Sequence, residues 1–224
     1  MKPRRVIDTT STPDGATLQL VWERGHYVIR ISGVTLMSSE MHGSEEAMAA
    51  AAAELLGDRA KSAKVLVGGL GMGFTLRAAL DAFGKGARIT VAELIPAVVA
   101  YNRGVLGPLA ERPLADKRVT LYHGDVRDAL RVAPWDAILM DVDNGPDAFT
   151  TTTNESLYDW LGVKAMAEAL APGGVLVLWS VEANSSFEKS LKRAGLKSES
   201  RRVRARLGAK GARHTLFIAQ RISF

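Results

Sequence analysis

The residues best suited to chemistry follow three short runs rich in β-branched residues. The first is the glycine-rich segment 68–73, where glycine lets the backbone turn sharply and approach a ligand without an intervening side chain. The second is Glu93, which stands 20 residues after Gly73, close to the spacing at which an acidic side chain meets ribose hydroxyls. The third is Asp125, placed to reach an adenine amino group. Together they favour a nucleoside cofactor.

Each motif also has a structural interpretation. The glycines could form a plain turn, Glu93 could complement a helix dipole, and Asp125 could cap a short helix. Three such elements at the ends of successive strands are more specific than one, because open α/β sheets bind ligands at that edge. The spacing Gly69-x-Gly71-x-Gly73 differs from the fingerprint of NAD enzymes, and no Gly-Lys-Ser/Thr follows. S-adenosylmethionine is therefore the expected cofactor.

The elements that must position these residues alternate between strand and helix, which predicts an α/β fold with a parallel sheet. Strands are expected at 64–67, 88–92, 118–122, 137–140 and 175–179, and helices at 74–83, 96–105, 153–170 and 185–194. Ser185 with Glu188, and Thr152 with Glu155, each fit a capping box at a helix start.

The two ends of the chain add smaller elements. Residues 16–22 and 26–31 alternate in polarity and predict a β-hairpin, and a helix is expected at 41–56. Residues 197–206 and 213–221 predict an antiparallel hairpin at the sheet edge. We therefore expect a small N-terminal unit at 1–60 and a Rossmann-like transferase domain at 61–224.

Composition restricts the class of protein. A chain of 224 residues with 47% hydrophobic residues and a mean hydropathy of +0.03 is typical of a soluble protein with one main core. The longest apolar runs are too short for a membrane helix. The basic N-terminus runs directly into polar residues, so we expect a cytoplasmic protein without membrane contact.

The absence of cysteine excludes thiolate chemistry, and the four scattered histidines predict no metal site. The net charge is +5, and the segment 189–213 contains ten Lys or Arg residues and only one acid, Glu199. This basic stripe could bind nucleic acid, or its charges could block pairing at a sheet edge, which we favour.

The chain resembles the spermidine synthase-like branch of the class I S-adenosylmethionine-dependent methyltransferase superfamily over roughly 36–179. Segment 68–73 is similar to the family's Gly-Gly-Gly-Asp-Gly-Gly, 91–96 to its Val-Glu-Leu-Asp-Pro, and 124–128 to its Gly-Asp-Ala-Arg. The resemblance implies a doubly wound, mostly parallel seven-stranded sheet with a small N-terminal β-structure, and often a homodimer. It implies cofactor contacts from Gly69, Leu70, Gly71, Met72, Gly73, Glu93, Leu94, Asp125 and Val126.

The resemblance also places the acceptor site. Asp141 falls on the family's catalytic aspartate, where a carboxylate can bind a cationic amine and take its proton before nitrogen attacks carbon. A strand-end acid that caps the next loop is the structural alternative. The implied substrate contacts are Asp143, Asn144, Glu182 and Glu46.

Some family positions differ here. The aspartate that meets the amine of decarboxylated S-adenosylmethionine is Gly71, so a cofactor that retains its carboxylate becomes more plausible. The second acceptor aspartate aligns with Asn144, and the family's tyrosine position is Ser44.

We therefore expect an S-adenosylmethionine-dependent transferase, with methyl transfer to an amine-bearing small molecule favoured. The first alternative is a spermidine synthase-type aminopropyltransferase that uses decarboxylated S-adenosylmethionine. The second is an RNA methyltransferase that uses the basic stripe, although the Asn/Asp-Pro-Pro-Tyr run of amino-methylating enzymes is absent and the acids near Asp141 would repel phosphate. A non-catalytic binding module is the third.

Overall fold

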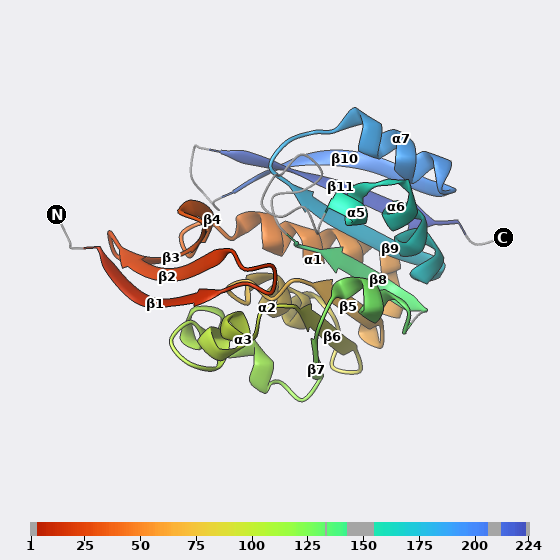
Figure 1. Ribbon diagram of the computed structural model, residues 1–224. Helices are drawn as coiled ribbons and strands as arrows, with labels where there is room; N and C mark the ends of the chain where they lie inside the picture. The colour runs from red at the N-terminus through yellow and green to blue at the C-terminus, as the bar shows by residue number, and fades with distance from the viewer. Residues whose placement is uncertain (1–3, 133, 143–154, 206–211, 223–224) are drawn as a thin grey trace.

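The computed structural model describes residues 4–132, 134–142, 155–205 and 212–222. Two sheets organise them (Figure 1). A seven-stranded sheet has the order β10-β11-β9-β8-β5-β6-β7, and a separate four-stranded sheet is formed by the N-terminal segment.

The seven-stranded sheet confirms the predicted fold class. Its parallel strands are β5 (Lys64–Gly68), β6 (Arg88–Glu93), β7 (Val119–His123), β8 (Trp135–Met140) and β9 (Leu170–Ser180). β10 (Leu196–Arg204) and β11 (Arg213–Arg221) run antiparallel at one edge, as the tail hairpin predicts. The order reverses between β5 and β8, and such a switch point opens a crevice at the carboxyl ends of the strands.

Alternation along the strands builds two cores, one on each face of the sheet. Val65 and Val67 pack with α1 (Gly43–Leu56), α2 (Phe74–Ala82) and α3 (Pro96–Arg103). Leu66 faces the opposite core, with α4 (Val126–Leu130), α5 (Glu155–Tyr158), α6 (Trp160–Ala169) and α7 (Ser185–Arg193). Because successive side chains of a strand point to opposite faces, these short apolar runs bury both faces.

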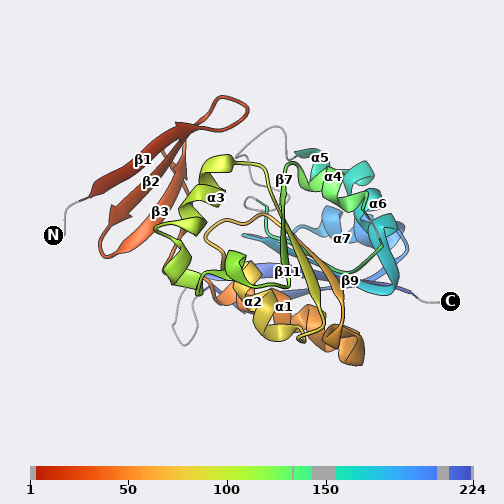
Figure 2. The same cartoon turned by 90° about the horizontal axis from the view of Figure 1, so that it is seen from below.

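The N-terminal sheet contains the predicted hairpin and two further strands. The predicted pair is β2 (Thr17–Glu23) and β3 (His26–Ile31), flanked by β1 (Arg5–Ser11) and β4 (Val34–Ser38). Leu18, Leu20 and Ile29 are buried in the same core as α1 to α3. Figure 2 shows this sheet at one end of the molecule beside α3, where Tyr101 Oη donates to Asp8 Oδ2 at 2.7 Å. The boundary at residue 60 stays a prediction.

Two helix starts differ from the capping prediction. α7 begins at Ser185, but its N-cap is Asn184, whose Oδ1 accepts the Phe187 N–H at 2.8 Å. The expected helix at 153–170 is divided into α5 and α6, with Asp159 capping α6 through the Gly162 N–H. Thr152 lies outside the described residues.

Much of the basic stripe lies on α7 and on the edge strand β10. The described Lys and Arg side chains of β10 are exposed, and β11 and β9 separate this strand from β8. An exposed basic edge strand is one way in which sheets avoid pairing with another chain. Nucleic acid binding by the stripe stays a prediction.

The end of the sheet opposite the crevice depends on Arg118. Its Nη1 donates to Leu80 O at 2.9 Å and Phe83 O at 3.2 Å near the end of α2, and its Nη2 donates to Asp116 Oδ2 at 2.9 Å. The Arg118 side chain is only 15% exposed, so water could replace few of these hydrogen bonds if the side chain were removed.

We expect Arg118→Met to lower the free energy of unfolding by about 2–3 kcal/mol, because it removes the guanidinium partner of the Asp116 carboxylate and of the Leu80 and Phe83 carbonyl oxygens. Urea denaturation measures the change. The control is Arg131→Met, whose ion pair with Asp128 is exposed and should matter by less than about 0.5 kcal/mol. Equal losses in the two variants would contradict this role.

Candidate functional site

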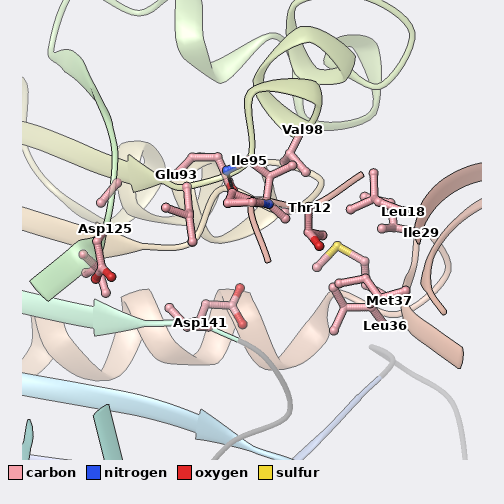
Figure 3. Close-up of a pocket in the computed structure, with 18 of the residues that line it drawn as sticks. Thr12, Leu18, Ile29, Leu36, Met37, Glu93, Ile95, Val98, Asp125 and Asp141 are labelled. Carbon is pink, nitrogen blue, oxygen red and sulfur yellow. Dashed lines mark hydrogen bonds between the residues drawn. The ribbon is translucent and has the colours of Figure 1, made fainter. Parts of the chain in front are cut away.

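A cavity of about 370 Å³ opens at the carboxyl ends of β5, β6, β7 and β8. One wall comes from these strand ends, and the other comes from the N-terminal sheet. Figure 3 shows Glu93 and Asp125 toward one end, Leu36 and Met37 toward the other, and Asp141 between them. The size is within the range of small-molecule sites. The strand-end wall thus carries three acids, and the N-terminal wall is mostly apolar, with Thr12 and Asp14 as its polar side chains.

The glycine loop after β5 brings two strand ends together. Gly69, Gly71 and Gly73 have φ of +88°, +50° and +87°, a region that favours glycine. The Asp141 N–H donates to Gly68 O at 2.9 Å. A Cβ on Gly69 would lie 2.4 Å from Asp141 O, so only glycine permits this approach. The loop therefore fixes where Asp141 enters the cavity.

Glu93 is buried at the end of β6 and ties the glycine loop to the start of α3. Its Oε2 accepts the Leu70 N–H at 3.0 Å, and its Oε1 accepts the Ile95 N–H at 2.8 Å. Burial raises the pKa of Glu93, and these backbone donors oppose that rise. Each carboxylate oxygen has a second lone pair, so Glu93 can still accept hydrogen bonds from a ligand.

Asp125 lies at the cavity and is also the N-cap of α4. Its Oδ1 accepts the Arg127 N–H at 2.8 Å, and the Arg127 guanidinium pairs with both oxygens. Hydrogen bonds from this guanidinium hold the pKa of Asp125 below its usual range. The capping interpretation is therefore present in the structure, while the adenine contact stays a prediction.

Asp141 follows β8 and lines the cavity. Its Oδ2 accepts the Thr75 Oγ1 hydrogen at 2.5 Å, across the switch point from α2. Burial raises the pKa of Asp141, while the Thr75 hydroxyl favours the charged form. Neither Thr75 nor its bond to Asp141 was predicted from the sequence.

Glu45 is the acid that the sequence did not identify. It precedes the buried Met48, Ala49 and Ala52 by three, four and seven residues, so it belongs to the inward face of α1. Burial raises the pKa of Glu45 first, and the nearby Asp141 charge raises it further.

Glu46, the predicted acceptor contact, instead lies at the surface. Its side chain is 47% exposed and pairs with His42 Nδ1 at 3.1 Å. The position of Glu46 along the helix agrees with this exposure, because Glu46 lies one turn before the exposed Ala50 and shares its outward face. The structure therefore brings Glu45, rather than Glu46, toward Asp141.

The position of the family's loop aspartate is apolar. A Cβ on Gly71 would lie 2.9 Å from Met37 Cε, so the Met37 thioether fills the space of a side chain there. Asn102, also missed from the sequence, holds the loop by donating to Gly71 O at 2.8 Å. No carboxylate is contributed to the cavity at residue 71.

The remaining predicted residues divide into groups. Gly69, Gly71, Leu94 and Val126 line the cavity, whereas Leu70 and Met72 are buried in the core and Gly73 is the N-cap of α2. Glu182 is exposed after β9, apart from the described lining residues. Asp143 and Asn144 lie outside the described residues. Contacts between these residues and a ligand stay predictions.

Two further features bear on the class of protein. Within the described ranges, no three His, Asp or Glu side chains gather as a metal site would require. No described helix is both long and apolar enough to cross a membrane.

Comparison with known proteins identifies the fold. No protein-family model matches the chain, and no curated protein sequence matches it. Among solved structures, a spermidine synthase in complex with the transition-state analogue AdoDATO matches with a TM-score of 0.74 and 17% identity. Spermidine synthase from Thermotoga maritima matches with a TM-score of 0.74 and 18% identity. Each match covers 96% of this chain and 72% of the other. The chain therefore has the fold of the spermidine synthases.

The approach of Gly69 to Asp141 yields a test. We expect Gly69→Ala to lower the free energy of unfolding more than Gly195→Ala, whose φ of +80° is similar but whose added Cβ meets nothing within 4 Å. The control should cost about 1–2 kcal/mol for backbone strain alone. The collision should add about 1–3 kcal/mol. Equal costs in thermal or urea unfolding would show that β5 and β8 do not meet as described.

Proposed function

We propose that this protein transfers an alkyl group from an S-adenosylmethionine-type sulfonium to an amine, and that aminopropyl transfer from the decarboxylated cofactor is its reaction. The observation that carries this proposal is Asp141 in the cavity of a spermidine synthase fold, with a second acid, Glu45, near enough for the two charges to interact. Carboxyl groups suit a cationic acceptor, because ammonium and carboxylate attract strongly away from water. The likeness to spermidine synthases makes aminopropyl transfer our first choice, in place of the methyl transfer that Gly71 suggested.

The cavity residues fit a nucleoside cofactor. Gly69 lets the backbone pass without a side chain, Glu93 retains acceptor lone pairs for hydroxyls, and Ile95 and Val98 offer apolar contact. When bound, the cofactor would supply an electrophilic carbon next to a sulfonium, whose carbon–sulfur bond breaks with its electron pair moving to sulfur.

The acids would act on the acceptor. An ammonium group must lose a proton before its nitrogen has a lone pair for attack. Asp141 is the base, since the Thr75 hydroxyl favours its charged form and the glycine loop fixes its position. Glu45 provides a second carboxyl group near Asp141.

Methyl transfer is the second candidate, and one observation favours it. Met37 occupies the space of a side chain on Gly71, so the loop contributes no carboxylate to pair with a cofactor ammonium. A cofactor that carries both an ammonium and a carboxylate needs such a partner less. The acceptor would again be an amine at Asp141.

Calorimetric titration with S-adenosylmethionine, its decarboxylated form and methylthioadenosine separates the two candidates. We expect the decarboxylated form to bind more tightly than S-adenosylmethionine. The reverse preference would support methyl transfer, and failure of all three to bind would contradict the cofactor proposal itself.

We expect Asp141→Asn to lower the turnover of 1,4-diaminobutane by about 100-fold or more, because the proton acceptor is lost. Cofactor affinity should remain within about threefold, a change below 1 kcal/mol. Product formation followed by mass spectrometry measures the rate. The control is Asp58→Asn, which removes an acid that is 92% exposed in its pair with Lys61. A variant at Asp141 with the normal rate would refute its role as base.

A further inference from the structure

The wall that the N-terminal sheet contributes to the cavity carries a charged side chain of its own. Apolar residues of β2, β3 and β4 line most of this wall, and the turn between β1 and β2 adds Thr12, Pro13 and Asp14. The other acids among the described lining residues stand at the ends of β6, β7 and β8 or directly after them. Asp14 therefore faces the cavity from the side opposite the strand ends.

The turn that carries Asp14 has a defined shape. The Gly15 N–H donates to Thr12 O at 2.9 Å, and the Thr12 N–H donates to Ala16 O at 2.9 Å. Gly15 has a φ of +86°, and the ring of Pro13 restricts the φ of its own residue. The hydroxyl of the buried Thr12 donates to Asp14 Oδ1. One carboxylate oxygen is thus oriented by the protein, and Oδ2 can accept hydrogen bonds from a ligand.

Asp14 differs from the neighbouring acids in its partners. Asp125 is paired with the Arg127 guanidinium, and Glu93 accepts two backbone N–H groups. Within the described part of the chain, no basic side chain forms an ion pair with Asp14. The charge of Asp14 is therefore available to a cationic group of a ligand.

The lining as a whole sets which charges a ligand can bring. No Lys, Arg or His is among the described residues that line the cavity. A carboxylate on a ligand would therefore meet no cationic side chain there, and removing an unpaired charge from water is costly. An ammonium group can instead pair with an acid on either wall. The lining favours a ligand whose charged groups are all cationic.

The proposed cofactor has a part for each wall. Its nucleoside fits the strand ends at Glu93 and Asp125, so the substituent on sulfur extends toward the N-terminal wall. Figure 3 shows Thr12 and Met37 on the far side of the cavity from Asp125. An aminopropyl group is a short chain of methylenes that ends in an ammonium. Its methylenes match the apolar side chains of this wall, and its ammonium needs one acid among them.

We propose that Asp14 determines which cofactor the site accepts: its carboxylate pairs with the ammonium of an aminopropyl group, from the wall opposite the glycine loop. The inference rests on the proposed function. It assigns to the turn between β1 and β2 the acid that residue 71 does not supply. S-adenosylmethionine gains less from Asp14, because the attraction of its ammonium is opposed by the repulsion of its carboxylate.

The test compares three ligands that share one nucleoside. Decarboxylated S-adenosylmethionine, S-adenosylmethionine and methylthioadenosine are titrated calorimetrically into the wild type and Asp14→Asn. We expect Asp14→Asn to weaken binding of the decarboxylated form about fivefold, since one partly exposed ion pair is lost. Binding of methylthioadenosine, which has no ammonium, and of S-adenosylmethionine should change by less than about twofold. Asparagine is common in turns, so the melting temperature should stay close to that of the wild type.

The matched control is Glu40→Gln. Glu40 belongs to the same N-terminal unit, is 49% exposed beside His26, and is absent from the described lining of the cavity. Its replacement removes the same charge, so we expect all three affinities to change by less than about twofold. Equal weakening of the decarboxylated form in the two variants would show a general effect of charge and overturn the inference.

Three further outcomes would overturn the role of Asp14 and leave the proposed function in place. The first is an unchanged affinity of Asp14→Asn for the decarboxylated form. The second is an equal loss for methylthioadenosine, which would show that the turn only shapes the wall. The third is an unchanged cofactor affinity with a raised KM for 1,4-diaminobutane, which would place Asp14 at the acceptor. Failure of the wild type to bind any of the three ligands would instead refute the proposed function, and this inference with it.

Discussion

The meeting of β5 and β8 at Gly69 is the contact on which the site depends. The order of the sheet reverses between these two strands, so the chain leaves them in opposite directions and a crevice opens where they end. Without a Cβ on Gly69, the Asp141 carbonyl comes within a distance that every other residue would block. The main chain of Asp141 is thereby fixed to the loop, and its side chain lines the cavity.

The sequence predicted the main sheet well because the physical signals there are local. Short runs rich in β-branched residues between helical stretches predict parallel strands, and each of the five predicted strands is present, four of them largely buried and β7 at the sheet edge less so. β1 and β4 were missed for the complementary reason. Both are almost free of buried side chains, so no alternation of polarity marks them. Their pairing is determined by neighbouring strands, which a local pattern does not encode.

The site was predicted in part, and the errors have a common cause. Glu93, Asp125 and Asp141 lie at the cavity because the ends of parallel strands converge, a rule that depends on topology alone. Glu45, Thr75 and Asn102 project from helices, where the face toward the site depends on helix phase and packing. A one-residue difference on α1 separates the inward Glu45 from the exposed Glu46. Sequence resemblance at a helix start does not determine that phase.

The charges near the cavity favour one class of ligand. Met37 lies against Gly71 at the glycine loop, Asp141 lines the cavity, and Glu45 on α1 is near enough to Asp141 for the two charges to interact. Two permanent carboxylates in this setting would oppose folding, because burial disfavours each charge and each charge disfavours the other. An ammonium group beside the two acids lowers that cost, whereas a neutral ligand does not, so the same pair of acids favours a cationic ligand.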